Sequence, residues 1–152
     1  MKKKSISQVK INESIIQVCL KNVEKNSLFV SEIFKIISRH NVNVDMISSI
    51  MLSDEMQIDF TADENCQSQL NEAIIEIQKN HPRIEMYSYK NIGKISISGD
   101  MAEETGVAYH IFKIFADCQI SFRQVTTSET SMDFVVEKKY LKTIYEKIKE
   151  MM

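Results

Sequence analysis

The chain has 152 residues, of which 43% are hydrophobic and 26% are charged, and its net charge at pH 7 is −2. This balance excludes the strongly basic surface that nucleic-acid binding needs, and no apolar run reaches the roughly 18 residues of a membrane span. The start of the chain, Met1–Lys4, is basic but has no secretory leader pattern. The three cysteines are odd in number and have no metal-ligand spacing, so we expect reduced thiols in a cytoplasmic protein without a cofactor.

Hydrophobic periodicity divides the first part of the chain into six elements. Strict alternation predicts strands, and apolar residues that recur every three or four positions predict helices. A proline disfavours helical backbone in the residue before it, so the second helix should end before Pro82. In chain order we expect strand 14–20, helix 27–40, strands 42–50 and 55–61, a helix with Leu70, Ala73, Ile74 and Ile77 on its apolar face, and strand 83–89. This β-α-β-β-α-β order is the ferredoxin-like arrangement of the α+β class.

The same order of elements begins again after Asn91. A single constant offset along the chain aligns Phe34 with Phe112, Val42 with Ile120 and Ile58 with Val136. Several hydrophobic coincidences at one offset indicate an internal duplication. The second set consists of strand 94–98, helix 107–115, strands 119–126 and 132–137, and a helix that carries Leu141, Ile144, Tyr145 and Ile148.

The second set has no fourth strand of its own. Without that strand one edge of its sheet would be exposed. Residues 5–11, which precede the first set, have a strand-like pattern and no other place in the fold. We therefore expect two interwoven domains, the first over residues 12–91 and the second over residues 92–152 together with strand 5–11.

Catalytic motifs are scarce in this sequence. His40, His81 and His110 have no ligand spacing, and we expect structural roles for them. The helix starts are more informative, because Ser27 and Thr105 are N-cap residue types and the free N–H groups of a helix start can hold a carboxylate. A glycine directly after Thr105 would let a ligand approach the backbone, although a capped helix after a tight loop explains the same residues.

Two segments resemble the ACT domains of aspartokinases. Residues 29–49 are similar to the first ACT domain of that family, most closely to its lysine-sensitive type. Residues 94–129 resemble the second ACT domain, and the family also interweaves the two. The matching residues of the second segment are Gly99, Met101, Gly106, Val107, Ala108, Phe112, Ile120, Thr127, Ser128 and Glu129.

The resemblance implies regulation and not catalysis, with no catalytic residue in this chain. It implies that an amino acid, lysine or threonine, binds where ACT domains of a homodimer meet, and that a separate amino-acid kinase subunit is a possible partner. Carried over residue by residue, the effector-binding positions are Asn26, Ser27, Leu28, Phe29, Asn43, Val44 and Asp45, and in the second domain Met101, Thr105, Gly106, Val107 and Ala108.

Two positions depart from the family pattern. Leu28 stands where the family has a loop glycine, and its side chain is expected to occupy space that a ligand needs. Arg123 stands in the second domain at the position that Asp45 has in the first. The alternative is therefore a structural or protein-interaction ACT module that has lost its effector.

Overall fold

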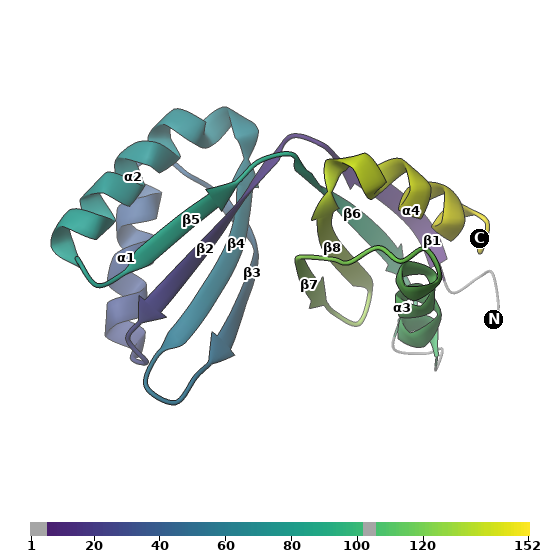
Figure 1. The fold of residues 1–152 in the computed structure, drawn as a ribbon, viewed down its shortest axis with the longest axis horizontal. Helices are drawn as coiled ribbons and strands as arrows, with labels where there is room; N and C mark the ends of the chain where they lie inside the picture. The colour runs from purple at the N-terminus through teal and green to yellow at the C-terminus, as the bar shows by residue number, and fades with distance from the viewer. Residues whose placement is uncertain (1–5, 102–105) are drawn as a thin grey trace. The chain divides into compact units, whose positions relative to one another are not determined.

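The computed structural model describes residues 6–101 and 106–152 (Figure 1). Contacts within the chain divide it into two units, which are described separately. We call residues 14–90 the first unit, and the described parts of residues 6–13 and 91–152 the second unit. Neither range contains a described helix with the length and apolar character of a membrane span.

The first unit is a four-stranded antiparallel sheet with two helices on one face (Figure 1). Its strands lie in the order β3-β4-β2-β5, so β3 and β5 are the edges. The elements are β2 (Ile15–Val23), α1 (Ser27–Arg39), β3 (Val44–Met51), β4 (Met56–Asp63), the 3₁₀ turn η2 (Glu64–Cys66), α2 (Gln67–Asn80) and β5 (Glu85–Tyr89). This is the expected β-α-β-β-α-β unit.

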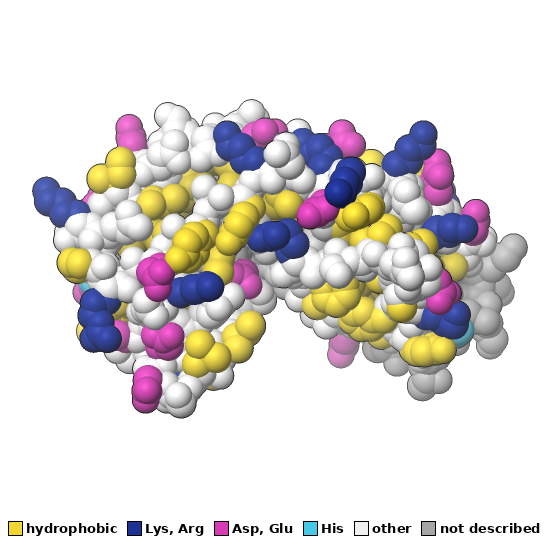
Figure 2. Space-filling view, in the orientation of Figure 1, with side chains coloured by type: hydrophobic (Ala, Val, Ile, Leu, Met, Phe, Trp, Pro, Cys, Tyr) yellow, Lys and Arg dark blue, Asp and Glu magenta, His cyan; other side chains and the backbone are white. Residues whose placement is uncertain are grey.

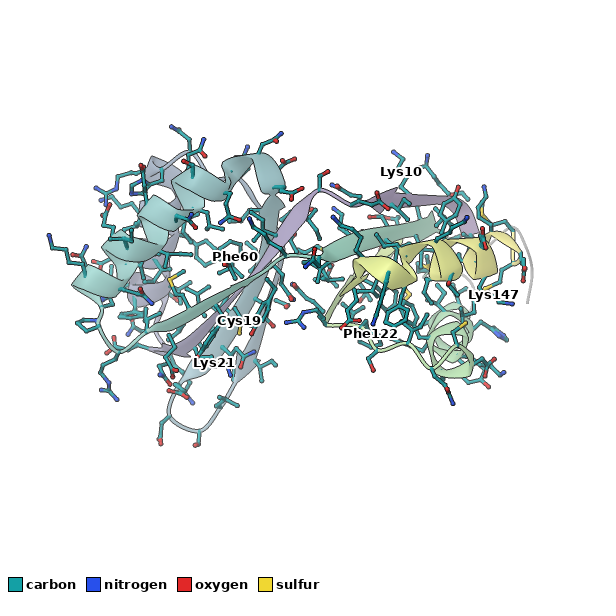
Figure 3. All side chains as sticks on the ribbon, turned by 45° about the horizontal axis from the view of Figure 1, so that its top comes forward. Lys10, Cys19, Lys21, Phe60, Phe122 and Lys147 are labelled. Carbon is teal, nitrogen blue, oxygen red and sulfur yellow. The ribbon has the colours of Figure 1, made fainter. Side chains whose placement is uncertain are left out.

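The core of the first unit lies between the sheet and the two helices. Val18 on β2 faces Phe60 on β4, and both are fully buried. Phe60 is labelled in Figure 3. The alternate residues of β2, such as Cys19 and Lys21, belong to the helix-free face because side chains alternate along a strand. The helices contribute residues at helical spacing: Ile33 and Ile37 from α1, and Leu70, Ala73 and Ile77 from α2.

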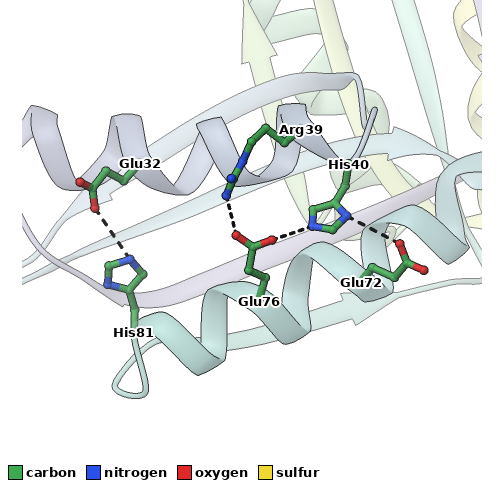
Figure 4. A network of polar contacts seen from close by, with 6 residues as sticks. All are labelled: Glu32, Arg39, His40, Glu72, Glu76 and His81. Carbon is green, nitrogen blue, oxygen red and sulfur yellow. Dashed lines mark hydrogen bonds and ion pairs between the residues drawn. The ribbon is translucent and has the colours of Figure 1, made fainter.

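Polar contacts also join α1 to α2 (Figure 4). The carboxylate of Glu76 on α2 lies 2.5 Å from the guanidinium of Arg39 and 2.9 Å from Nε2 of His40, at the end of α1. The other ring nitrogen of His40 lies 3.7 Å from Glu72. A second pair joins His81, after α2, to Glu32 on α1 at 4.0 Å. These pairs hold the exposed sides of the two helices together.

The second unit has the same topology, but one of its strands comes from the start of the chain. Its sheet order is β1-β6-β8-β7, so β1 occupies the edge that β5 occupies in the first unit. β1 runs antiparallel to β6 from the pair Ile6–Gly99 to the pair Asn12–Lys94. The elements are β1 (Ile6–Asn12), β6 (Ile92–Gly99), α3 (Val107–Asp117), β7 (Gln124–Thr127), β8 (Ser131–Glu137), η3 (Lys138–Tyr140) and α4 (Leu141–Lys149). The predicted interwoven α+β fold is confirmed.

Phenylalanine rings fill much of the second core. Phe134 on β8 is fully buried and lies 4.5 Å, centroid to centroid, from Phe115 on α3. The rings of Phe112 and Phe122 lie 5.7 and 5.2 Å from the same ring. Phe122 is labelled in Figure 3. Tilted and edge-to-face pairs at these distances add to the stability that burial provides.

The prediction of a strand over residues 119–126 is wrong in its first half. Gln119 has a φ of 56°, which ends α3, and the amide of Ile120 returns to the carbonyl of Phe115. Ile120 is buried in the core, and pairing with β8 begins only at Gln124. Alternating hydrophobicity in this segment therefore reflects core contacts of a connection and not a strand.

The constant offset between the two sets of elements also fails beyond the helices. In the first unit Phe60 faces Val18 and β4 ends at Asp63, whereas in the second unit Phe134 faces Ile95 and β8 ends at Glu137. The counterpart of Ile58 is thus Met132 and not Val136. The hairpin is shorter in the second unit, because β7 has 4 residues and β3 has 8, and this shifts the alignment.

Candidate functional site

Asn26, and not Ser27, caps the start of α1. The backbone of Asn26 is extended, with φ −146° and ψ 146°, and its Oδ1 accepts a hydrogen bond from the amide of Phe29 at 2.7 Å. Asn and Ser are equally good caps, so the sequence could not choose between neighbours. Ser27 is the first helical residue, and the amides of Ser27 and Leu28 are among the donors that a helix start leaves without a partner inside the helix. Thr105, the expected cap of α3, lies outside the described residues.

Leu28 lies within the first turn of α1 and has a side chain that is 73% exposed. The helix begins early enough to include this position, so Leu28 does not need the left-handed backbone that glycine favours. Gly106, its counterpart at the constant offset, caps α3 with a φ of 89°. The two helix starts therefore differ in backbone geometry as well as in side chains.

A groove runs along the start of α1, and two of the predicted residues line it. We call it the α1 groove; it has a volume of about 530 Å³. The Nζ of Lys25 donates to the carbonyls of Leu52 at 2.7 Å and Ser53 at 2.8 Å, which fixes the β3–β4 turn beside this loop. The groove is lined by Lys25, Asn26, Ser27, Val30, Ser31, Met51 and Met56. Its mixture of polar and apolar groups suits a small polar molecule with an aliphatic part.

Phe29 faces away from the α1 groove. Its ring is half-buried against the first core and lies 4.8 Å from the ring of His81 in an edge-to-face contact. Of the four predicted residues around this helix start, Asn26 and Ser27 thus line the groove, Leu28 faces solvent, and Phe29 contributes to the opposite side of the loop.

The predicted residues at the start of β3 lie at the other end of the strand. Val44 pairs with Ala62 and packs against the core, while Asp45 pairs with Thr61 and is exposed. Asn43 is exposed and precedes the strand. Met51, in the α1 groove, is six residues beyond Asp45, which corresponds to about 20 Å at the rise of a strand. One copy of the chain therefore does not bring the two halves of the predicted site together.

The outer side of β3 is an unpaired sheet edge within the described residues. A bulge between Asp45 and Ser48, where Met46 has a φ of 47°, bends the strand. Figure 2 shows hydrophobic side chains at the surface beside the β3–β4 turn. The most exposed are Ile47 (53%), Ile50 (55%), Met51 (63%) and Leu52 (45%). An edge of this kind is able to pair with another strand.

The second unit arranges its predicted residues differently. The side chain of Val107 belongs to the core, Met101 packs partly against that core, and Ala108 is exposed. A Cβ at Gly106 would meet only Cδ2 of His110, at 3.9 Å. Glycine is therefore favoured at this position by the positive φ and not by lack of space.

Sheet register corrects the counterpart of Asp45. Asp45 lies opposite Thr61, the residue after Phe60, and Gln124 lies opposite Val135, the residue after Phe134. Gln124 therefore occupies the position of Asp45, and Arg123 precedes it. The bulge in β3 adds a residue that the constant offset did not take into account.

Several lining residues of the α1 groove were not expected from the sequence. Met51 and Met56 flank the predicted turn, but only the folded sheet brings them to a loop that lies well before them in the chain. The hydrogen bonds from Lys25 to the carbonyls of Leu52 and Ser53 could not be predicted either. Every residue has a backbone carbonyl, so the sequence does not mark these two as acceptors.

Comparison with known proteins agrees with this architecture. Residues 95–151 match the family model described as ACT domain. The chain is 31% identical over 144 residues to an aspartokinase of Pseudomonas aeruginosa, a match that covers 93% of the chain and 35% of that protein. The chain spans about one third of the length of the curated relatives it matches.

Solved structures share the fold at lower identity. The regulatory subunit of aspartate kinase from Thermus thermophilus has a TM-score of 0.87 and 19% identity, over 98% of this chain and 99% of that one. Escherichia coli aspartokinase III, solved in complex with lysine and aspartate, has a TM-score of 0.72 and 18% identity, over 96% of this chain and 33% of that one. The second unit thus matches the ACT domain family in sequence, and the whole chain has the interwoven fold of the regulatory region of aspartokinases.

Proposed function

We propose that the chain is an amino-acid-binding regulatory module of the aspartokinase type, which forms a homodimer and binds lysine or threonine between ACT units of two copies. It would act on an amino-acid kinase and have no kinase activity of its own. The observation that carries the proposal is the separation of the two halves of the predicted site along β3, whose outer edge is unpaired.

A two-fold axis would unite the two halves. If the β3 edges of two copies pair antiparallel, the start of one strand lies beside the end of the other, and the same residues meet twice. Asp45 of one copy then lies near Met51 and the α1 groove of its partner. The exposed side chains of Ile50 and Leu28 would become buried in the same interface.

The groups that meet in this arrangement match an α-amino acid. The free amides at the start of α1 would hold the carboxylate, and the carboxylate of Asp45 would pair with the ammonium group. Lysine is a ligand of the related E. coli aspartokinase III structure, which supports this class of effector here. A ligand that prefers one dimer arrangement must in turn be bound more tightly by that arrangement.

Calorimetric titration with each of the twenty amino acids tests the proposal. We expect a response to L-lysine or L-threonine, and an affinity about tenfold weaker after Asp45→Ala, because an ionic hydrogen bond is lost. The control is Glu146→Gln, a change at an exposed position of α4. Absence of any response, or equal affinity in Asp45→Ala and the native chain, would remove the effector site described above.

A second candidate is an ACT module that binds a protein partner and no amino acid. Leu28 favours it, since an exposed leucine stands where the family has a loop glycine. In that case the native chain would bind none of the twenty amino acids, whereas Leu28→Gly would acquire measurable affinity for one of them.

A further inference from the structure

The first unit has a second cavity, separate from the α1 groove. Its volume is about 380 Å³, within the range of small-molecule sites, and it shares no lining residue with the α1 groove. Four segments of the first unit surround it: the end of β2, the start of α1, the β3–β4 turn and the connection from α2 to β5. We call it the α2–β5 cavity.

The lining of the α2–β5 cavity divides into an apolar part and a charged part. Val23 and Ile84 are buried, and the half-buried ring of Phe29 lies beside them. Three carboxylates line the charged part, from Glu24 at the end of β2 and from Asp54 and Glu55 in the β3–β4 turn. The guanidinium of Arg83 and the imidazole of His81 lie in the connection from α2 to β5. Carboxylates outnumber the guanidinium, so the cavity favours a ligand with net positive charge.

Hydrogen bonds to backbone carbonyls hold the charged segments in place. The two hydrogen bonds from Lys25 anchor the β3–β4 turn, and the amide of Leu52 donates to the carbonyl of Glu55 at 2.8 Å. On the other side, Nδ2 of Asn22 donates to the carbonyl of Arg83 at 3.1 Å. The acidic and basic sides of the cavity are thus tied to the same β2–α1 segment, so their spacing is fixed by the fold.

These charges do not neutralise one another. Among the ion pairs between described residues, none involves Asp54, Glu55 or Arg83. A ligand with an ammonium group and a carboxylate would find opposite charges for both without breaking a pair within the protein. That is the condition under which charge-assisted hydrogen bonds contribute most to affinity.

We propose that the α2–β5 cavity binds a basic α-amino acid of the lysine type. Arg83 holds the α-carboxylate, the carboxylates of Asp54 and Glu55 hold ammonium groups, and the aliphatic chain lies on Val23 and Phe29. The ligand class rests on the proposed function, but this site lies within one copy and needs no dimer. It would let the chain sense a basic amino acid independently of the site between copies.

Calorimetric titration of L-lysine into the full chain tests this site. We expect Arg83→Gln and Glu55→Gln each to weaken the cavity's affinity about tenfold, while the matched control Glu146→Gln leaves it unchanged. L-Norleucine lacks the side-chain ammonium and cadaverine lacks the carboxylate, so both should bind more weakly than L-lysine. The affinity should also not depend on protein concentration, since no second copy is involved.

The outcomes separate this site from the one between copies. Two L-lysine sites per chain, one lost in Arg83→Gln and the other in Asp45→Ala, would support both proposals. L-Lysine binding that Asp45→Ala weakens and Arg83→Gln and Glu55→Gln do not would overturn the α2–β5 cavity alone. Binding of threonine without lysine would also overturn it, and binding of no amino acid would overturn both.

Discussion

Gly93 and Gly106 are required for two different physical reasons. A Cβ at Gly93 would collide with Cδ1 of Leu141 and lie 3.1 Å from the carbonyl oxygen of Asn12, so β6 needs a glycine where α4 and β1 approach it. At Gly106 there is space for a Cβ, but the φ of 89° is unfavourable for any other residue. Packing thus requires the glycine at position 93, and backbone conformation favours the glycine at position 106.

The substitution Gly93→Ala should therefore destabilise the chain more than Gly106→Ala. We expect about 1 kcal/mol for Gly106→Ala from the left-handed backbone, and about 2 to 3 kcal/mol for Gly93→Ala from overpacking. Urea unfolding monitored by circular dichroism measures both free energies. Equal costs would show that Leu141 moves aside without resistance.

The sequence predicts a role for Gly106 but not for Gly93. Gly106 follows a possible helix cap, Thr105, and it matches the pattern of the second ACT domain. The need for Gly93 arises from Leu141, which lies in the last helix of the chain, and only the packed helix reveals it. Likewise, Asn26 and Ser27 are both good caps, and the backbone at Asn26 decides between them.

Between elements, the contacts of Glu76 with α1 make the packing of the two helices sensitive to acid. The hydrogen bond from His40 and the nearby charge of Arg39 lower the pKa of the Glu76 carboxyl below its usual 4.5. A carboxyl with a lowered pKa in the folded state stabilises that state above its ordinary pKa. This contribution is lost as the pH falls from about 4.5 through the lowered value.

The variant Glu76→Gln should therefore lose stability at neutral pH and not in acid. We expect its urea midpoint to lie below that of the native chain at pH 7, and the difference to shrink as the pH falls below 4.5. Glu146→Gln, on the exposed face of α4, is the control and should show no such pH dependence. A difference that stays constant from pH 7 to pH 3 would argue against ionic stabilisation by Glu76.

Most elements could be predicted because their apolar residues follow one period each. The period failed where a connection contributes to the core, as at Ile120 and Phe122, which alternate without pairing. It also could not reveal the bulge at Met46, which shifts the counterpart of Asp45 to Gln124. A bulge leaves the pattern of hydrophobic residues nearly intact while it changes the pairing.

For the whole molecule, β1 supplies the fourth strand of the second sheet from the opposite end of the sequence. Ile6 and Val9 bring buried side chains to the second core, and the β1 backbone covers the edge of β6. The number of strands was enough to predict this arrangement. The second set of elements lacked its fourth strand, and the strand-like segment at residues 5–11 belonged to neither set.

Removal of residues 1–12 should consequently unfold the second unit and leave the first intact. Heteronuclear NMR would show dispersed signals for residues 14–90 and collapsed signals for residues 91–152. A peptide of residues 5–12 added in excess should restore the second set of signals. Dispersed signals for the second unit without the peptide would contradict the structural role of β1.

The candidate site was less predictable than the fold. The resemblance led to Asn26 and Ser27, which line the α1 groove, but which residues lie side by side depends on the length of β3. The sequence does not show that β3 separates the two halves of the predicted site, and it contains no information about a second copy. The charged lining of the α2–β5 cavity comes from segments as distant in the chain as Glu24 and Arg83, beyond the reach of any local pattern.

The exchange of β1 also sets an order of events during protein synthesis. β1 leaves the ribosome before its partner β6, which follows only after the entire first unit. At typical translation rates this delay lasts roughly 5 to 20 s, ample time for a small domain to fold. The first unit should thus complete its own sheet before β6 is made, while the backbone N–H and C=O groups of β1 still have no partner strand. A slowed ribosome would prolong that wait, during which β1 of one nascent chain is able to pair with β6 of another.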